Sequence, residues 1–352
     1  MSKINPSKVK VVGVDLAKHV IRISVVSHSG KELRNCDLSR AKFAAFLATQ
    51  KPSLIAFEAC ATSHYWARKA SEFGHKIKIL PALSVAPYRQ GHKTDKNDAL
   101  AVAECAVRPN IKEAPLKTIE QQGLQSIQRS REFLVRDKTA LSNHMRSLLM
   151  EFGIVINQGF KALHRDVPLA LECGDNELPD MLRSTLQLMY ERFCALEADI
   201  KQLDEQVKVL VRQNQSCNEL TSIEGVGPIG ALLLYATLGT GEAFESGREF
   251  SAYLGLTPKQ YSSGGKTNMV GLSRKVANKS LRSILIQGAR AYIHFGKLGD
   301  SPKDQWLTKL ISRAGVGKAS VALANKNVRT AWALLTKGLE YECRYGETAI
   351  AA

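Results

Sequence analysis

Short apolar runs rich in Val and Ile dominate the first hundred residues, and each is bounded by Gly, Ser or Pro, as strands are. These runs cover residues 9–14, 20–27, 54–57 and 76–80. Helical stretches near 39–49 and 63–73 separate the later runs, and another helix starts around Asp95. The first two runs are close enough to pair as a hairpin. The order predicts a mixed α/β sheet in which helices supply the crossover connections.

Between residues 119 and 213 the apolar positions take a helical period. Those of the second half repeat in alternating steps of four and three residues, which is typical of an a/d coiled-coil seam. The seam comprises Leu182, Leu186, Met189, Phe193, Leu196, Ile200, Leu203, Val207 and Leu210. A weaker stripe precedes it at Leu124, Ile127, Leu134, Leu141, Met145 and Leu148. Arg131 and Lys138 interrupt this stripe at core-type spacing. The seam closes either within the chain, as a helical hairpin, or between two chains, and we interpret residues 153–179 as an irregular connection.

A third region starts near Leu220 and predicts short helices separated by glycines. It opens with Glu224-Gly-Val-Gly-Pro, which resembles the turn of a helix-hairpin-helix. In such a turn Gly225 and Gly227 would let backbone N–H groups meet a phosphate. An ordinary packing joint between two helices is the alternative, because Gly-Val-Gly is short and common. The three patterns divide the chain into domains at residues 1–118, 119–215 and 216–346, followed by a tail at 347–352.

The formal net charge of the 352 residues is +16, and its distribution is uneven. Between Pro258 and Tyr345, 16 Lys and Arg stand against four acids, a net charge of +12. A localised basic excess indicates a polyanion as partner, and nucleic acid fits better than anionic lipid because no amphipathic segment gathers Trp or Phe. No apolar run is long enough to cross a membrane or act as a signal peptide. The seven scattered cysteines form no C-x-x-C pair, which favours a reducing cytoplasm.

Four carboxylates in the first hundred residues carry the candidate chemistry. Asp15 and Glu58 each close an apolar strand, and Asp95 and Asp98 lie three residues apart on one helix face. Burying like charges together is costly unless a cation lies between them. Carboxylates are the ligands that Mg²⁺ prefers, and two such ions about 3.5–4 Å apart serve phosphoryl transfer. Singly, each acid is more often a surface residue, and Asp95 could cap its helix; together they predict a site for Mg²⁺, with two ions expected.

A second candidate lies in residues 253–266, which we interpret as a flexible basic loop. A serine hydroxyl at Ser262 or Ser263 beside Lys266 could act as a nucleophile on phosphorus, because Gly264 and Gly265 permit close approach of a backbone. The alternative is a structural Ser/Gly-rich turn.

With these motifs in order, the chain resembles the DEDD-type insertion-sequence transposases, which include the Piv-type DNA invertases. The resemblance rests on Gly-Val-Asp15-Leu-Ala-Lys, Phe-Glu58-Ala, Lys-Thr-Asp95-Lys-Asn-Asp98-Ala, Ile-Glu-Gly-Val-Gly-Pro and Gly-Leu-Thr-Pro-Lys-Gln-Tyr-Ser-Ser263-Gly-Gly-Lys. It implies a ribonuclease-H-like, resolvase-like N-terminal domain, an α-helical coiled-coil middle and a mostly α C-terminal transposase domain. The family's catalytic serine directly precedes a glycine, which points to Ser263. The resemblance also implies a bacterial, nucleoid-associated protein, a bridge-type guide RNA, and homodimers that assemble into a tetramer on two DNA duplexes.

Our hypothesis from the sequence is a Mg²⁺-dependent recombinase that acts on donor and target DNA. The four acids would hold the metal against the scissile phosphate, and Ser263 would attack it. Basic residues would contact the nucleic-acid backbone: Lys266, Arg274, Lys275, Lys279, Arg282 and Arg290. One alternative is a metal-dependent nuclease or junction resolvase that uses water, with no role for the serine. The other is a non-catalytic DNA-binding protein.

Overall fold

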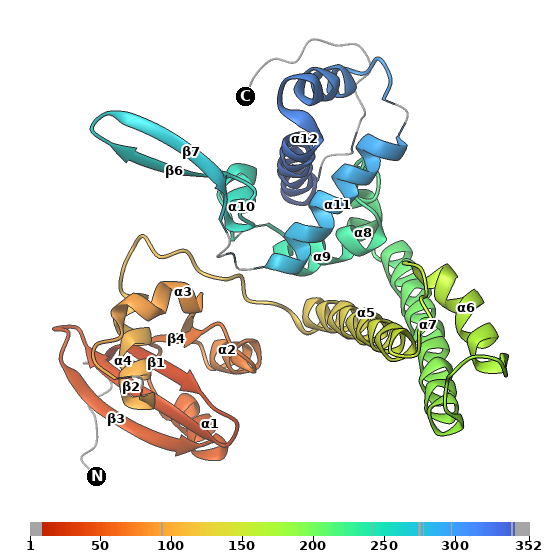
Figure 1. Cartoon of the computed structure of the whole chain (residues 1–352). Coiled ribbons are helices and arrows are strands. Elements are labelled where there is room, and N and C mark those ends of the chain that lie inside the picture. The colour runs from red at the N-terminus through yellow and green to blue at the C-terminus, as the bar shows by residue number, and fades with distance from the viewer. Residues whose placement is uncertain are drawn as a thin grey trace.

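The computed structural model describes residues 9–92, 94–241, 243–273, 276, 278–296, 298–338 and 341. In chain order it consists of a sheet with helices, a pair of long helices, and a mainly helical C-terminal part that carries a projecting hairpin (Figure 1). Among the described residues, no helix is both long and apolar enough to cross a membrane.

The N-terminal sheet has five strands in the order β3-β2-β1-β4-β5. They are β1 (Val9–Leu16), β2 (Val20–Ser27), β3 (Glu32–Ser39), β4 (Leu54–Glu58) and β5 (Lys76–Leu80). The first three form an antiparallel meander, and β4 and β5 run parallel to β1. The mixed sheet and its four apolar strands are therefore confirmed. The sequence pattern missed β3, because this edge strand is mostly polar and buries only Leu38.

Helices cover both faces of this sheet. One face packs against α1 (Arg40–Thr49) and α2 (Ser63–Glu72), and the other packs against α4 (Asp95–Ala106). Two short turns, α3 (Ala82–Val85) and η2 (Ala86–Tyr88), lead from β5 to α4.

The contact between α4 and β1 is unusually close, and it depends on Gly13. A Cβ atom built there would lie 2.2 Å from the Ala99 carbonyl oxygen and 2.5 Å from the Ala103 nitrogen. Only a residue without a side chain lets the helix backbone lie this near to the strand. Gly13 therefore sets the height of α4 above the sheet.

The middle of the chain is a pair of packed helices, α5 (Ile119–Met150) and α7 (Asp180–Gln213). The two cations that interrupt the α5 stripe pair with acids of α7. Arg131 forms a bidentate pair with Asp204, at 2.5 and 3.2 Å, and Lys138 lies 3.3 Å from Glu197. The apolar seam predicted from the sequence thus closes within the chain, as a helical hairpin.

The sequence predicts an irregular connection between these helices, and this prediction is wrong because the connection contains α6 (Phe160–Glu172). The prediction was wrong because Pro168 lies inside this helix. Proline lacks an N–H, so the carbonyl four residues earlier is left without its helical donor. That carbonyl belongs to His164, and the Tyr190 hydroxyl donates to it at 3.4 Å. The proline is tolerated because α7 supplies the missing donor.

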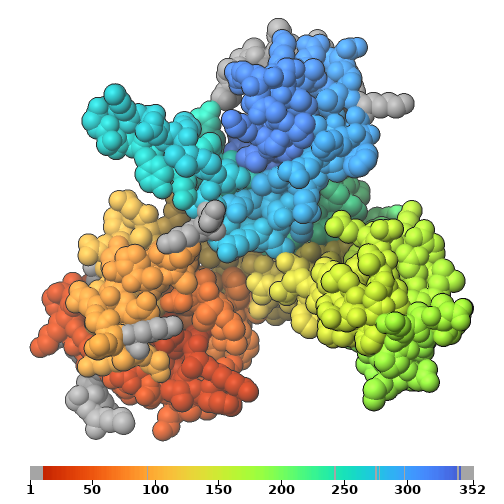
Figure 2. Space-filling view, in the orientation of Figure 1, coloured from red at the N-terminus to blue at the C-terminus, as the bar shows by residue number. Residues whose placement is uncertain are grey.

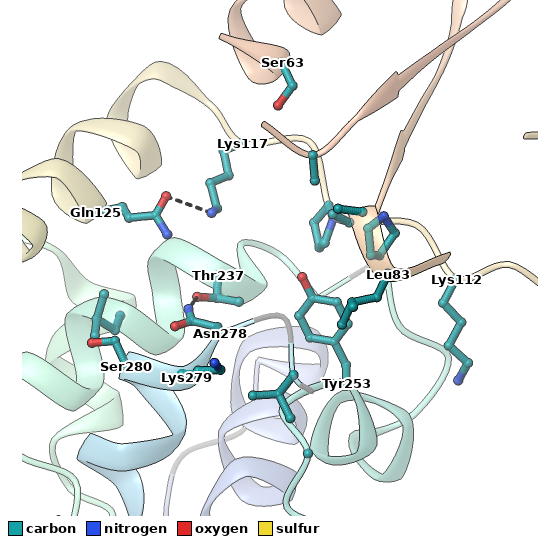
Figure 3. Close-up of a pocket in the computed structure, with 18 of the residues that line it drawn as sticks. Ser63, Leu83, Lys112, Lys117, Gln125, Thr237, Tyr253, Asn278, Lys279 and Ser280 are labelled. Carbon is teal, nitrogen blue, oxygen red and sulfur yellow. Dashed lines mark hydrogen bonds between the residues drawn. The ribbon is translucent and has the colours of Figure 1, made fainter. Parts of the chain in front are cut away.

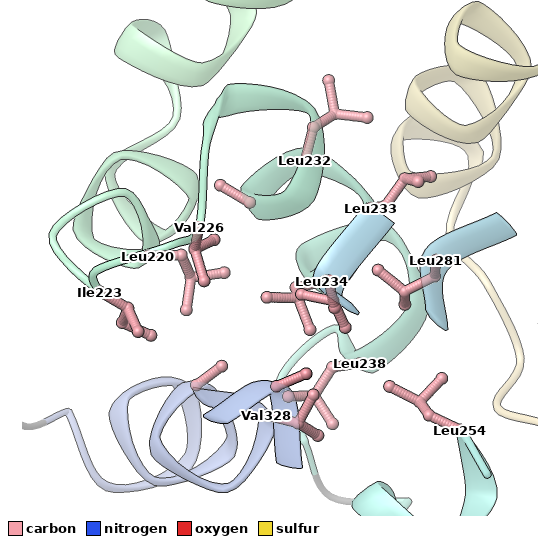
Figure 4. Close-up of a cluster of buried hydrophobic side chains, with 14 of the residues drawn as sticks. Leu220, Ile223, Val226, Leu232, Leu233, Leu234, Leu238, Leu254, Leu281 and Val328 are labelled. Carbon is pink, nitrogen blue, oxygen red and sulfur yellow. The ribbon is translucent and has the colours of Figure 1, made fainter. Parts of the chain in front are cut away.

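The C-terminal part packs its helices around one apolar core, shown in Figure 4. Its elements are α8 (Gln215–Leu220), α9 (Pro228–Leu238), α10 (Gly247–Tyr253), β6 (Pro258–Ser263), β7 (Lys266–Leu272), α11 (Lys279–Phe295) and α12 (Pro302–Lys337). Leu234 and Leu238 of α9 lie at its centre, and Leu232 belongs to the same cluster. The start of α5 and the end of α7 also reach this core, through Leu124 and Val207. The expected short helices are partly confirmed, but α12 runs for 36 residues with a break at Gly315.

Gly13→Ala should lower the stability of the protein, because the added methyl group would overlap the backbone of α4. Overpacking of this kind costs about 1–3 kcal/mol. The matched control is Gly123→Ala, at an exposed position of α5 where an added Cβ meets nothing within 4 Å. Because alanine favours a helix by about 0.5–1 kcal/mol over glycine, this variant should gain stability. Urea unfolding followed by circular dichroism measures both, and equal effects of the two variants would contradict the role given to Gly13.

Candidate functional site

Strand alternation brings Asp15 and Glu58 to the same face of the sheet. Val14 and Phe57 are paired neighbours on the parallel strands β1 and β4, so Asp15 and Glu58 follow at equivalent positions. Successive side chains of a strand point to opposite faces. Val11 of β1 and Ala56 of β4 pack in the α4 cluster, and Asp15 and Glu58 are in phase with them. Both carboxylates therefore lie on the face that α4 covers, at the ends of their strands.

The other two carboxylates lie in the first turn of α4, which starts on this face. The Thr94 side chain caps the helix by accepting from the Asn97 N–H at 3.4 Å. Asp95 is exposed, whereas the Asp98 side chain is only 16 % exposed. Asp98 Oδ1 accepts from Arg89 Nη1 at 3.0 Å. Because Gly13 holds α4 close to β1, the first turn of the helix lies beside the ends of the strands.

The charges of the other three acids act on Asp15. Burial first, and then the charges of Asp95, Asp98 and Glu58, raise the pKa of Asp15 from 3.8 to about 6. A hydrogen bond from the Leu16 backbone opposes this effect. Burial, together with the charges of Glu58 and Asp15, also raises the pKa of the neighbouring Cys60 thiol to about 11, so this thiol stays protonated. The charges of the other three acids therefore reach Asp15, and a site shared by all four stays a prediction.

The oxygen atoms of the four carboxylates are of the type that binds divalent cations. Carboxylate oxygens are the ligands of Mg²⁺, and a cation between the acids would relieve the repulsion that raises the pKa of Asp15. Across the described part of the chain, however, no group of three or more His, Cys, Asp and Glu side chains is arranged to hold a metal ion. Asp98 is engaged with Arg89 through Oδ1.

Ser263 ends β6 and faces Lys266, the first residue of β7, across a two-residue turn. The turn residues Gly264 and Gly265 have φ of 55° and 76°, as the tight turn of a hairpin requires. The segment is therefore a β-ribbon and not the flexible loop that the sequence suggested. No hydrogen bond of the Ser263 side chain occurs within the described residues.

The ribbon is open on both faces. Every residue of β6 and β7 is at least partly exposed, including the apolar Tyr261, Met269 and Val270 at 58, 70 and 53 %. Figure 2 shows the ribbon projecting from the C-terminal part, and in Figure 1 it points away from the sheet. Ser263, at its tip, belongs to a different element from the four carboxylates, which lie on the N-terminal sheet and α4.

The glycines of the predicted phosphate-binding turn have unequal surroundings. Gly225, with φ of 84°, packs against α11, where an added Cβ would lie 3.1 Å from the Gly288 carbonyl oxygen. This close packing is what the alternative, a joint between helices, requires. Gly227 is exposed at the start of α9, and an added Cβ there meets nothing within 4 Å. A role in binding phosphate stays a prediction for both glycines.

The predicted basic contacts lie mostly on α11 and the ribbon. Lys279 and Arg290 are exposed, as is Lys266 at the ribbon tip. Arg282 is half-buried and donates to the Ser273 carbonyl at 2.5 Å, so it also anchors the base of the ribbon. Arg274 and Lys275 lie outside the described residues.

The sequence did not reveal a cavity of about 1290 Å³ between the sheet and the C-terminal part. We call it the central cavity. Its walls come from the segment after β4, the start of α5, and the bases of β6 and α11 (Figure 3). Five cationic side chains line it: Lys112, Lys117, Arg129, Lys259 and Lys279. They come from segments far apart in the chain, and no spacing rule could have joined them.

Comparison with known proteins places both candidate sites in matched segments. A family profile for DEDD transposases of IS110, described as a transposase, matches residues 12–154. Another, described as the transposase IS116/IS110/IS902 family, matches residues 217–302. The first segment contains the four carboxylates, and the second contains Ser263.

Three similar proteins extend over almost the whole chain. The transposase for insertion sequence element IS1111A of Coxiella burnetii is 36 % identical over 335 residues, which cover 95 % of this chain and 92 % of that protein. A probable family 20 transposase of Pseudomonas aeruginosa is 37 % identical over 327 residues, or 93 and 96 % of the two chains. The pilin gene-inverting protein of Moraxella bovis is 23 % identical over 359 residues, which cover 96 % of this chain and 98 % of that protein.

Asp15→Asn should stabilise the metal-free protein above about pH 6. The folded state favours protonated Asp15, so ionisation removes stability as the pH rises from about 4 to about 6. Asparagine cannot ionise and should gain on the order of 1–2 kcal/mol after solvent screening is allowed for. The gain should vanish near pH 4. Melting temperatures across this range measure it, with Glu72→Gln, at an exposed acid of α2, as the control. A gain that does not depend on pH would contradict the coupling of the four acids.

Proposed function

The chain belongs to the IS110/IS116 family of transposases, and on this premise we propose that it cuts and rejoins DNA by metal-assisted phosphoryl transfer at the four carboxylates. The position of the two pairs of acids supports the proposal: Asp15 and Glu58 end paired strands on the face that α4 covers, Asp95 and Asp98 lie in the first turn of α4, and the charges of the other three act on Asp15. Family membership argues against a non-catalytic DNA-binding protein, because a transposase is a DNA-cleaving and rejoining enzyme.

The DEDD transposase family generally uses divalent metal ions, and Mg²⁺ suits the oxygen donors of this chain. Asp15 and Glu58 would hold it from the strand ends, and Asp95 and Asp98 from α4. When bound, two such ions stabilise negative charge on the attacking and leaving oxygens of a phosphoryl transfer. The protein residues supply the geometry: the sheet fixes one pair of carboxylates, and Gly13 fixes the distance of the other pair.

The finer part of the proposal concerns the nucleophile. Ser263 Oγ would attack the scissile phosphorus and lose its proton, while the P–O bond to one strand breaks and its oxygen leaves as a hydroxyl. The phosphoserine ester keeps the energy of the broken bond, so a hydroxyl of another strand can displace the serine without ATP. Lys266, opposite Ser263 in the ribbon, is placed to attract the phosphate. Exposure of the whole ribbon supports this role, because a strand of DNA or another chain can cover it.

The partners follow from the charge and from the family. Donor and target DNA match the basic C-terminal quarter of the chain, in which Lys266, Lys279, Arg282 and Arg290 are described cations. A structured guide RNA of the bridge type and a homodimer that forms a tetramer on DNA complete the proposal. Because Ser263 lies at the tip of an exposed ribbon, two arrangements are open to it: the ribbon closes onto its own sheet, or it serves the sheet of another chain.

One observation favours a second function. Ser263 belongs to the β6–β7 ribbon and not to the element set that carries the carboxylates, so a water molecule could be the nucleophile, as in a metal-dependent junction resolvase or nuclease. In that case Ser263 would be only a turn residue of the ribbon.

Ser263→Ala separates these functions. The wild-type protein, with Mg²⁺, its guide RNA and DNA that carries the element ends, should form a covalent protein–DNA adduct that survives denaturing electrophoresis. Removal of the nucleophile should abolish the adduct and slow recombination by on the order of a thousandfold or more. The control is Ser262→Ala, which removes a hydroxyl from the neighbouring residue and should keep both activities.

Asp15→Asn tests the metal part independently. The variant should bind DNA but neither cleave nor join it, because one of the four carboxylates is lost. If Ser263→Ala still cleaves DNA without an adduct and Asp15→Asn does not, the water-dependent nuclease is the correct function. If Asp15→Asn keeps full activity, the assignment of the carboxylates is wrong.

A further inference from the structure

The central cavity concentrates positive charge that the protein does not neutralise. Of its five cations, Lys112 pairs with Glu249 at 2.9 Å. The other four, Lys117, Arg129, Lys259 and Lys279, form no ion pair within 4.0 Å in the described part of the chain. Among the described residues of the cavity wall, the single carboxylate is that of Glu132, and the Ser280 hydroxyl donates to it.

Lys117 lies at the centre of this charge. Its ammonium donates to the neutral Gln125 Oε1 at 2.9 Å, across the cavity from Thr237 and Asn278 (Figure 3). Burial, and then the charge of Arg129, lowers the pKa of Lys117 to about 8. The same surroundings lower the pKa of His64 to about 4, through burial and then through Lys117, Arg68 and Arg129. A half-buried lysine beside an arginine, with no carboxylate, destabilises the fold unless an anion joins them.

A second observation points to a missing ligand. Gln128 is 3 % exposed and lines the central cavity, yet its Oε1 has no hydrogen-bond partner in the part of the chain that the structure describes. Buried polar atoms are rarely left in this state. Because the two ends of a side-chain amide exchange places by rotation about its last bond, Gln128 can present N–H donors to an anion between Lys117 and Arg129.

The position and size of the cavity suit a nucleic-acid strand better than a small anion. It begins at Ala59 and Cys60, directly after Glu58, and ends at Lys259 and Ser273 at the base of the ribbon. A strand that leaves the carboxylates along this path approaches the base of the element that carries Ser263. The volume of about 1290 Å³ exceeds the roughly 300–1,000 Å³ of small-molecule pockets.

The walls of the cavity are fixed in place before any ligand binds. Arg68 of α2 donates to the Lys117 carbonyl at 2.9 Å and to Gln122 of α5 at 2.8 Å. Lys112 and Glu249 join the segment after the sheet to α10. Preorganised donors of this kind bind an anion without the cost of ordering them.

We propose that the central cavity is a binding site for the backbone of the DNA strand that enters the four-carboxylate site, with Lys117, Arg129 and Gln128 around one phosphate. The proposal rests on the proposed function, because it assigns the ligand as the DNA on which the enzyme acts. Lys259 and Lys279 lie along the same path and contact neighbouring phosphates.

Lys117→Met is the decisive variant, because a binding role and a structural role predict opposite changes in stability. If the lysine serves DNA, its removal relieves repulsion from Arg129, and the melting temperature of the free protein should stay equal or rise. Affinity of the full chain for a short duplex DNA, measured without metal by fluorescence anisotropy, should fall about tenfold, and the slope of log affinity against log salt should decrease by about one. Arg129→Gln should give the same pattern, and Lys117→Arg should keep wild-type affinity.

The control variant is Lys208→Ala, which removes an exposed cation of α7 that pairs with Glu205 outside the cavity. It should leave both affinity and salt slope unchanged. An RNA duplex of the same sequence forms the second arm. If Lys117→Met weakens only RNA binding, the site belongs to RNA and the DNA proposal is overturned.

The proposal is also overturned if Lys117→Met and Arg129→Gln both bind DNA like the wild type, or if both lower the melting temperature and leave binding intact. These outcomes are distinct from a failure of the proposed function, since binding is measured without metal. The proposed function fails if Asp15→Asn still cleaves DNA. This result does not depend on the affinity of the Lys117 variants for DNA. A wild-type chain that binds no DNA would overturn both.

Discussion

The close contact between β1 and α4 at Gly13 is the constraint on which the N-terminal site depends. Two carboxylates belong to strand ends, whose positions the sheet determines, and two belong to a helix that could pack at many heights. The missing side chain at residue 13 removes this freedom, because the Ala99 carbonyl and the Ala103 nitrogen approach the strand directly. A site built from carboxylates needs such rigidity, since their mutual repulsion pushes the two elements apart. The apolar residues of β1 and α4 hold them together against it.

The sequence predicted the elements that bury apolar side chains and missed those that do not. The four Val- and Ile-rich strands and the two long helices are found where the periodicity places them, because burial on one face leaves a period in the sequence. β3 buries only Leu38, and the ribbon of β6 and β7 buries almost nothing, so neither leaves such a pattern. The helix α6 was missed for another reason: the hydrogen bond from Tyr190 that compensates Pro168 comes from a different helix.

For the sites, features that follow from local spacing could be predicted, and features that depend on the packing of distant segments could not. The strand and helix positions of the two pairs of acids could be predicted, because strand alternation and helical spacing are local rules that each place two of them. The ion pair between Arg89 and Asp98 could not, because its geometry depends on the path of the short turns before α4. The central cavity was equally hidden, since Lys117, Lys259 and Lys279 meet only after three separate parts of the chain have packed. Charge counting located a basic region but assigned it to the C-terminal quarter alone.

The ribbon of β6 and β7 is a long projection that is attached near one end. It is about 20 Å long, from the rise of its six-residue strand, and its described side-chain attachments are near the base: Arg282 to the Ser273 carbonyl at 2.5 Å, and Asn325 to the Leu256 carbonyl at 3.2 Å. A rotation of about 20° at the base would carry the tip through about 7 Å, whereas it would hardly move the base itself. In such a movement the reach of the Ser263 hydroxyl would depend on residues about ten positions away from it, around the base, and the two glycines beside it would contribute only the shape of the tip.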